Sequence, residues 1–179
     1  MKQPLVSIII IDYKDNNPYL VECLEAIQKQ SHQNFEIILI TDYKNNLEYP
    51  KFKKKHFGKY VGPAEKRDIG AKMAKWEILA FIDDDAYPDK NWLKYMVNNF
   101  EDNNIVGVGG PGVTPPNVNW AEEASGWSSA SPLGSGAYLY RFLPKGKRFV
   151  DDYPSMNLAV RKRVFLEVGG YDSNYWPGE

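Results

Sequence analysis

The 179-residue sequence has little that would cross-link the chain or hold it in a membrane. Its single cysteine, Cys23, excludes an intrachain disulfide and fits a reducing compartment. No apolar run approaches the roughly 20 residues of a membrane span. The apolar run from Val6 to Ile11 is too short for a signal peptide and leads into Asp12. These absences predict a cytoplasmic protein.

The sequence also has no large excess of charge of either sign, and it has few histidines. The net charge is −1, so no overall basic field indicates nucleic acid as a partner. Two scattered histidines, His32 and His56, do not have the spacing of zinc ligands with Cys23. The hydrophobic content of 43% is typical of a globular protein, and the length fits one domain over residues 1–179.

The first two thirds of the chain alternate short apolar runs with helical patterns. This alternation predicts an α/β fold with a doubly wound, mainly parallel sheet. In the second expected helix, Ile69, Met73 and Trp76 supply an apolar stripe, and Lys66, Arg67 and Lys72 give it a basic side. The expected strands are 5–11, 35–40, 57–61, 78–82 and 105–108, and the expected helices are 18–30, 62–75 and 88–100. Residues 51–55, rich in lysine, are read either as a solvated face or as a phosphate-binding patch.

The last third has a different character. We expect a short helix at 119–128, a flexible stretch at 128–136, and antiparallel strands at 137–142 and 148–150. A strand at 157–161 then leads into a helix at 162–168. Residues 107–112 match the pattern G-x-G-x-x-G, but Val113 and two prolines follow where a dinucleotide site must open a helix. That function is therefore rejected in favour of a tight loop.

The most informative stretch runs from Ile78 to Asp85. A buried apolar strand, Ile78 to Ile82, ends directly in Asp83, Asp84 and Asp85. Ligands of open α/β sheets bind at the carboxyl ends of the strands, and adjacent carboxylates suit Mg²⁺ or Mn²⁺ better than zinc. The competing interpretation is an acidic turn in which Asp85 or Asp89 caps the next helix. The stretch by itself leaves both open.

Six stretches in order together resemble the family 2 glycosyltransferases of the GT-A fold. They cover nearly the whole chain and correspond to the family's first strand, first helix, second strand, Arg-Asn helix start, DxD metal motif and acceptor-side segment. In that order they are 6–11, 23–31, 34–42, 66–70, 82–85 and 157–172. The resemblance implies a GT-A-like sheet with a small antiparallel acceptor-side element. It divides the domain into a nucleotide-sugar and metal half (1–110) and an acceptor half (111–179).

The resemblance implies transfer of a sugar from a nucleoside diphosphate sugar, with UDP favoured, to an acceptor hydroxyl. A divalent metal, Mn²⁺ or Mg²⁺, would stabilise the departing diphosphate. Asp85 is expected to ligate it directly, and Asp83 to act through water or on the ribose. Asp84 is also expected to contact the nucleotide, although the alternation of side chains along a strand would point it away from Asp83 and Asp85.

The remaining donor-side residues follow from the same resemblance. Asp42 would accept the N–H of a uracil-type base, and Arg67 would reach the base or a phosphate. Ile11 and Tyr13 would line the base pocket by backbone contact and stacking. Gly109 and Gly110 would let the backbone approach the donor sugar.

The acceptor side is expected at Asp152, Asn157 and Trp176. The family usually carries a Glu-Asp pair whose Asp is the catalytic base, and this sequence reaches Glu179 and stops. We therefore expect Glu179 to adjoin the base rather than to be it, with the acceptor half incomplete and turnover by this chain in doubt. Acceptors in the family are glycans or lipid-linked glycans, so the inner face of the membrane is an expected location, in cell-envelope glycan synthesis.

Several departures keep other functions open. The family often has Pro-Thr-Tyr-Asn after its first strand, where this chain has Ile11-Asp12-Tyr13-Lys14. A non-catalytic nucleotide-sugar-binding domain is the main alternative, because the expected base is missing. A receiver-type phosphoacceptor domain would use Asp12 and Asp15, but the aromatic second half does not fit it. A nucleotidyltransferase would need a glycine-rich loop after the first strand, which the sequence lacks.

Overall fold

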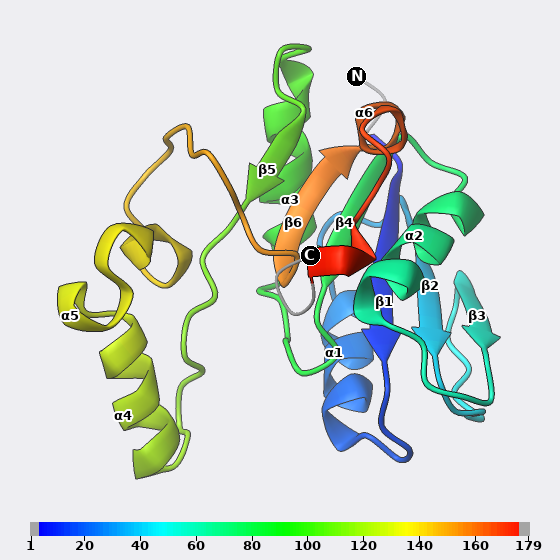
Figure 1. The fold of residues 1–179 in the computed structure, drawn as a ribbon, viewed down its shortest axis with the longest axis horizontal. Helices are drawn as coiled ribbons and strands as arrows, with labels where there is room; N and C mark the ends of the chain where they lie inside the picture. Colours follow the sequence, from blue (N-terminus) through cyan, green and yellow to red (C-terminus); the bar gives the residue numbers. More distant parts are fainter. Residues whose placement is uncertain (1–3, 176–179) are drawn as a thin grey trace.

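A computed structural model describes residues 4–175. Six strands form one sheet with the order β3-β2-β1-β4-β6-β5 (Figure 1). The strands β1 to β4 are parallel, and β6 runs antiparallel to both β4 and β5. The strand bounds are Val6–Asp12 (β1), Phe35–Thr41 (β2), Phe52–His56 (β3), Ile78–Ile82 (β4), Gly107–Gly109 (β5) and Asn157–Arg161 (β6). The predicted α/β class and mainly parallel sheet are confirmed, and the antiparallel element is β6 within the main sheet.

Helices cover both faces of the sheet. The helices α1 (Pro18–Gln28) and α3 (Trp92–Asn98) pack on one face, where Ile8 and Ile10 of β1 point. The helices α2 (Pro63–Met73) and α6 (Lys162–Glu167) cover the other face, where Ile9 points. Alternate side chains of a strand point to opposite faces, so a strand buried on both faces reads as a continuous apolar run.

The strand β3 lies at the edge of the sheet, and the prediction of a strand at 57–61 is wrong. The pairing of β3 with β2 runs from Phe52 to His56, through the lysine-rich stretch. Two of its lysines form ion pairs with nearby glutamates: Lys53 pairs with Glu36, and Lys54 pairs with Glu48. Charged side chains on an edge strand prevent pairing with other chains, which gives this lysine cluster a structural reason.

Helix α2 presents a different face to the sheet from the predicted one. Its buried residues are Ala64, Lys66, Arg67, Gly70 and Ala71. Ile69 and Met73, expected inside, are only partly buried. A β-carbon on Gly70 would come within 2.6 Å of a side-chain carbon of Ile9, so the helix lies close against β1. The side of α2 that was predicted to be basic, at Lys66 and Arg67, is therefore its buried side.

Helix α3 begins at Trp92 and not at Pro88. The side chain of Gln30 donates to the carbonyl of Asp89 and accepts from the backbone N–H of Leu93. These bonds tie the backbone at Asp89 and Leu93 to the chain just after α1, and residues 88–91 are not helical. Helix α1 begins as predicted, with Asn17 capping it at the N–H of Tyr19 and Pro18 in its first turn.

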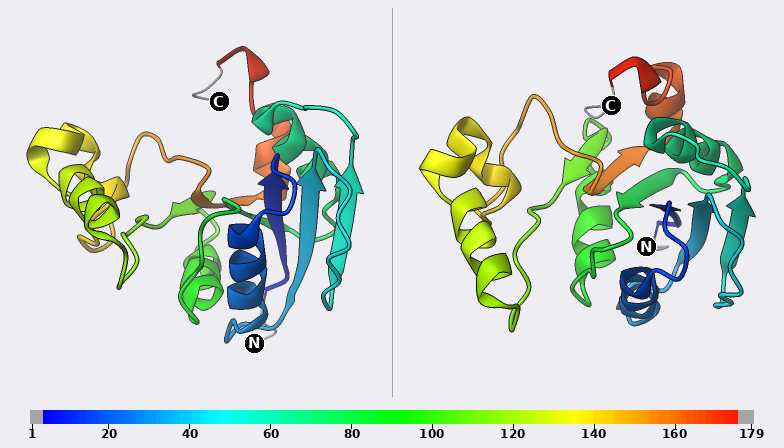
Figure 2. Two further views of the ribbon diagram at one scale, coloured as in Figure 1. Left: turned by 90° about the horizontal axis from the view of Figure 1, so that it is seen from below. Right: turned by 60° about the horizontal axis from the view of Figure 1, so that its bottom comes forward.

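Residues 111–156 extend away from the sheet (Figure 2). This segment contains the short helices α4 (Trp120–Ser129) and α5 (Pro132–Ser135) and the 3-10 turn η2 (Gly136–Arg141). Two further 3-10 turns, η1 (Asn99–Glu101) and η3 (Ser173–Tyr175), lie outside it. Helix α4 confirms the predicted helix, with a capping box between Asn119 and Glu122. The predicted strand pair is wrong, since 137–142 is mostly η2 and 148–150 is irregular. Arg141 stacks on Tyr138 at 4.2 Å, a contact three residues apart that favours a helical turn.

Among residues 4–175, no helix combines the length and apolar character needed to cross a membrane. Residues 107–109 form β5, and the chain continues without a helix to residue 119, which agrees with the rejection of a dinucleotide site.

Candidate active site at the carboxyl ends of the central strands

The carboxyl ends of three parallel strands bring aspartates together at one edge of the sheet. Asp12 ends β1, Asp42 follows β2, and Asp83 follows β4. Strand β1 pairs with both β2 and β4, so the three positions are neighbours across the sheet. The edge is where an open α/β sheet binds its ligands.

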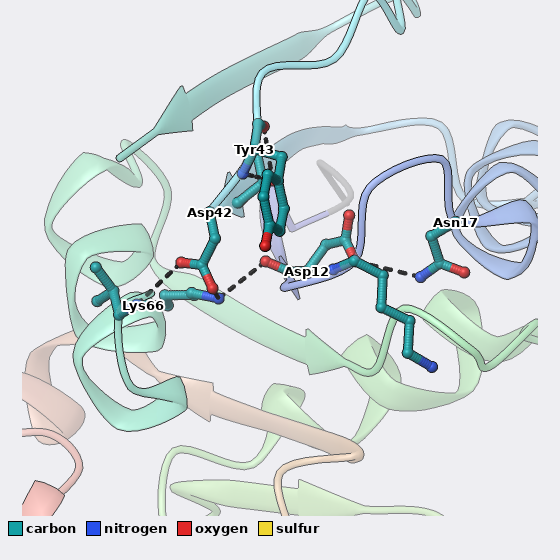
Figure 3. Close-up of polar contacts among 8 residues, drawn as sticks. Asp12, Asn17, Asp42, Tyr43 and Lys66 are labelled. Carbon is teal, nitrogen blue, oxygen red and sulfur yellow. Dashed lines mark hydrogen bonds and ion pairs between the residues drawn. The ribbon is translucent and has the colours of Figure 1, made fainter. Parts of the chain in front are cut away.

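Asp42 is held by a buried lysine. The Nζ of Lys66 lies 2.8 Å from Oδ2 of Asp42 and donates to the carbonyl oxygen of Asp12 at 2.9 Å, as Figure 3 shows. The other carboxylate oxygen of Asp42 accepts from the backbone N–H of Val61. Both Lys66 and Asp42 are only 2% exposed. The lysine therefore ties α2 to the ends of β1 and β2.

Asp83 is held by a buried arginine from the same helix. The guanidinium of Arg67 donates to Oδ1 of Asp83 at 3.1 Å and lies over the ring of Tyr171. Burial raises the pKa of Asp83, Arg67 opposes that shift, and the charge of Asp85 adds to it. The arginine thus lies beside the acidic turn, and its expected contact with a base or a phosphate stays a prediction.

Asp84 points to the opposite side from Asp83, in agreement with strand alternation. The amide nitrogen of Asn17 donates to Oδ2 of Asp84 and to Oδ1 of Asp12. Burial is the main cause that raises the pKa of Asp84 to about 7, and the neighbouring carboxyls of Asp12 and Asp85 add to it. Asn17 thus joins the loop after β1 to the acidic turn after β4.

Asp85 is exposed, which leaves its carboxylate open to a ligand. Within residues 4–175 no three His, Cys, Asp or Glu side chains converge on a ready-made metal site. Mg²⁺-type ions are often held by one or two carboxylates together with substrate phosphates. The raised pKa values of Asp83 and Asp84 also indicate carboxyls whose charge lacks full compensation. The donor set therefore fits a metal shared with a diphosphate, and not an all-protein cage.

A cleft of about 460 Å³ opens beside Asp12 and Asn17, and neither the acidic turn 83–85 nor the Asp42–Lys66 pair is among its lining residues. The loops that follow β1 and β2 form its walls, with Asp12, Asn17, Thr41 and Tyr43 among the lining residues. Tyr13, expected to stack on a base, is half exposed and carries Lys14 over its ring. Ile11 is partly buried and packs against the α2 face of the sheet.

The two glycines expected near a donor sugar pack against the chain itself. A β-carbon on Gly109 would meet the ring of Tyr153 at 2.4 Å, and one on Gly110 would meet the amide nitrogen of Asn157 at 2.9 Å. Asn157 begins β6 opposite Ile82, so the structure brings it to the same edge as the acidic turn.

Asp152 is held by its own segment. Its carboxylate accepts from the hydroxyl of Tyr140 at 2.7 Å and from the guanidinium of Arg141 at 2.6 Å. These two bonds lower the pKa of Asp152, in that order of importance. Trp176 and Glu179 lie outside the described residues.

Three residues of this edge were missed by sequence reasoning: Lys66, Asn17 as a bridge between carboxylates, and Trp92 as a partner of Asn157. One signal for Lys66 was available. Ala64, Gly70, Ala71 and Ala74 are small residues on one side of α2, and small residues let a helix lie close to a sheet. That pattern identifies the buried side of α2 better than Ile69 and Met73 do.

The mainly parallel sheet, with an acidic turn, a buried arginine and a buried lysine at its carboxyl edge, places this chain among the open α/β proteins whose ligands bind at that edge. The model of the family "Glycosyl transferase family 2" matches residues 7–165. The chain therefore belongs to glycosyl transferase family 2.

Two relatives with curated names show how far the likeness extends. The chain is 27% identical over 187 aligned positions to a glucosyl-dolichyl phosphate glucuronosyltransferase of Haloferax volcanii, covering 94% of this chain and 56% of that protein. It is 28% identical over 102 positions to the glycosyltransferase GlyG of Streptococcus pneumoniae, covering 51% of this chain and 34% of that protein.

Solved structures share the fold. The mannosyltransferase PcManGT from Pyrobaculum calidifontis, in complex with GDP-Man and Mn²⁺, matches with a TM-score of 0.62 and 14% identity over 96% of this chain and 48% of that one. S. aureus TarS 1-349, in complex with UDP-GlcNAc, matches with a TM-score of 0.53 and 21% identity over 64% of this chain and 36% of that one. The chain thus spans about half the length of the first relatives in each comparison.

Proposed function

We propose that this chain carries the donor site of a glycosyltransferase that moves a sugar from a nucleoside diphosphate sugar to an acceptor hydroxyl. The observation that carries the proposal is the acidic turn 83–85 at the carboxyl end of β4, with Arg67 paired to Asp83 beside it. The family membership supports the same reaction class.

The proposed reaction depends on charge compensation at the departing diphosphate. Asp85, with Asp83, would hold a divalent metal, which when bound withdraws charge from the phosphate oxygens. Arg67 would donate to a phosphate oxygen from the α2 side of the turn. Its buried position fixes the guanidinium before the ligand arrives, so little reorganisation is needed when charge develops.

For the base, UDP remains our proposal, with Asp42 as the residue that accepts a base N–H. Asp42 is covered by Val61 and neutralised by Lys66. A base N–H at Asp42 would therefore share the carboxylate with these two donors, since each carboxylate oxygen can accept more than one hydrogen bond. The cleft formed by the loops after β1 and β2 is lined by Thr41 and Tyr43, the two sequence neighbours of Asp42, and Tyr43 is half exposed there.

The acceptor is proposed to be a glycan or lipid-linked glycan, as the name of the Haloferax volcanii relative indicates for that protein. The location proposed with it is the cytoplasmic side of a membrane, in cell-envelope glycan synthesis. Inversion at the sugar carbon is proposed by family analogy, with the base expected next to Glu179.

A non-catalytic nucleotide-sugar-binding domain is the second candidate. The observation that favours it is that Asp152, the predicted acceptor-side carboxylate within residues 4–175, is poorly suited to take over the role of the base expected next to Glu179. That carboxylate is tied to Tyr140 and Arg141, and its lowered pKa makes it a poor proton acceptor.

The test is a donor panel with Mn²⁺: UDP-glucose, UDP-N-acetylglucosamine, UDP-glucuronic acid and GDP-mannose, each with a lipid phosphate-linked sugar as acceptor. Metal-dependent transfer from one donor, lost in Asp85→Asn, supports the transferase. Metal-dependent binding without release of nucleotide supports the binding domain. Silence of the whole panel contradicts both.

A further inference from the structure

Asn157 lies beside the acidic turn but takes no part in the ion pairs there. It is the first residue of β6 and pairs with Ile82, the residue before Asp83. Its carbonyl oxygen accepts from the backbone N–H of Gly110 at 3.2 Å. Backbone pairing on both sides therefore fixes the position from which its side chain starts.

The orientation of its amide follows from its partner. The indole Nε1 of Trp92 lies 2.8 Å from Oδ1 of Asn157. An indole N–H can only donate, so the atom facing it must be the amide oxygen. The amide nitrogen then has to point away from Trp92, and it lies over the α-carbon of Gly110, where a side chain would collide with it. No acceptor within residues 4–175 is paired with that nitrogen.

Trp92 is well placed to hold this orientation. It is 8% exposed and belongs to the core between α3 and the sheet, together with Ile82 and Ala159. A buried indole that has a single hydrogen-bond partner resists a flip of that partner, because the flip would leave its N–H without an acceptor.

We propose that Asn157 donates a hydrogen bond from its amide nitrogen to an oxygen of the transferred sugar, and that Trp92 is the positioning residue that aims it. The inference rests on the proposed glycosyl transfer and assigns a substrate contact within it. The cations Lys66 and Arg67 lie on the α2 side of the turn, whereas Asn157 and Trp92 are on the α3 side. A neutral amide suits a hydroxyl oxygen, and the cations suit the diphosphate.

Asn157→Asp separates a substrate role from a structural one. Aspartate keeps an oxygen for Trp92 but cannot donate to a substrate, whereas Asn157→Ala removes both. We expect both variants to lose about tenfold or more in kcat/KM for transfer, the scale of one lost hydrogen bond. Transfer by Asn157→Asp within twofold of wild type overturns the proposal, as does full rescue of that variant by excess Mn²⁺, which would reduce its defect to metal affinity.

The role of Trp92 is tested by Trp92→Phe, alone and combined with Asn157→Ala. If Trp92 acts through Asn157, Trp92→Phe should lower kcat/KM several-fold in the wild-type background. The same substitution should cause no further loss when Asn157 is already replaced by alanine. Equal losses in both backgrounds would overturn the positioning role.

A measurement that needs no turnover distinguishes failure of the Asn157–Trp92 contact from failure of the proposed glycosyl transfer. In a ¹H–¹⁵N spectrum, the Trp92 indole signal, identified by its loss in Trp92→Phe, should move upfield in Asn157→Ala and should not move upfield in Asn157→Asp, where a carboxylate oxygen still accepts. An unmoved signal in Asn157→Ala overturns the hydrogen bond itself. If instead wild type binds no nucleotide, the proposed function fails even though the indole shift behaves as expected.

Discussion

The sheet with its carboxyl edge and the segment 111–156 are built on different principles. In β1 and β2, Ile8, Ile10 and Leu39 are completely buried between helices. In the segment 111–156, helix α4 buries no residue, and Trp120, Leu133 and Phe149 are 82%, 100% and 93% exposed. The two regions also stand apart in space (Figure 2).

The difference decides which side chains are fixed in advance. Asp42, Lys66 and Arg67 are held by burial and by neighbouring strand ends. Asp152 is held by Tyr140 and Arg141 on the surface, where each such contact is worth little. The donor-side proposals therefore rest on a preorganised edge, while Asp152 on the acceptor side rests on local surface contacts.

The largest effect is expected at the buried ion pair. Lys66→Met leaves Asp42 charged and buried without its partner, which should lower the free energy of unfolding by about 3–5 kcal/mol. Lys54→Met is the matched control, because its pair with Glu48 is exposed and should cost about 1 kcal/mol or less. Urea unfolding measures both, and equal losses would contradict the contrast between edge and surface.

A leucine pair compares the two regions directly. Leu24 is buried in the core and Leu133 is fully exposed on α5. Leu24→Ala should cost about 2–5 kcal/mol by loss of burial and creation of a cavity, and Leu133→Ala should stay within about 0.5 kcal/mol. A large loss in Leu133→Ala, measured by the same unfolding experiment, would mean that the segment is buried in solution.

A smaller effect is expected in the pH dependence of stability. The pKa of Asp84 is about 7 in the folded chain, against an ordinary value of 3.8. Between those values the folded state keeps a proton that the unfolded state releases, so stability from this group is complete below the lower value and lost as pH rises to about 7.

Asp84→Asn should therefore flatten the decline of unfolding free energy between pH 5 and pH 7, measured in EDTA. Asp152→Asn is the surface control, since its lowered pKa gives a contribution of opposite sign, gained as pH rises through the acid range. An unchanged slope in Asp84→Asn would contradict a proton held at the acidic turn.

The same contrast explains what the sequence could predict. Continuous apolar runs such as Ile78 to Ile82 identify buried strands, and Asn17-Pro18 identifies a helix start, so the parallel core and its acidic edge were predictable. The segment 137–150 was not, because the chain there follows contacts such as Arg141 with Tyr138 and Asp152 instead of an apolar period. The buried Lys66 escaped prediction because a lysine is almost never fully buried unless it is paired, and its partner Asp42 lies 24 residues away.

The most direct test of the account is calorimetric titration of UDP and GDP, with and without Mn²⁺, into this chain and into Asp85→Ala. We predict binding of a nucleoside diphosphate that requires Mn²⁺ and disappears in Asp85→Ala, with the fold unchanged by circular dichroism. Binding that persists in Asp85→Ala, or no binding of either nucleotide by the wild-type chain, would contradict a metal-dependent donor site at the end of β4.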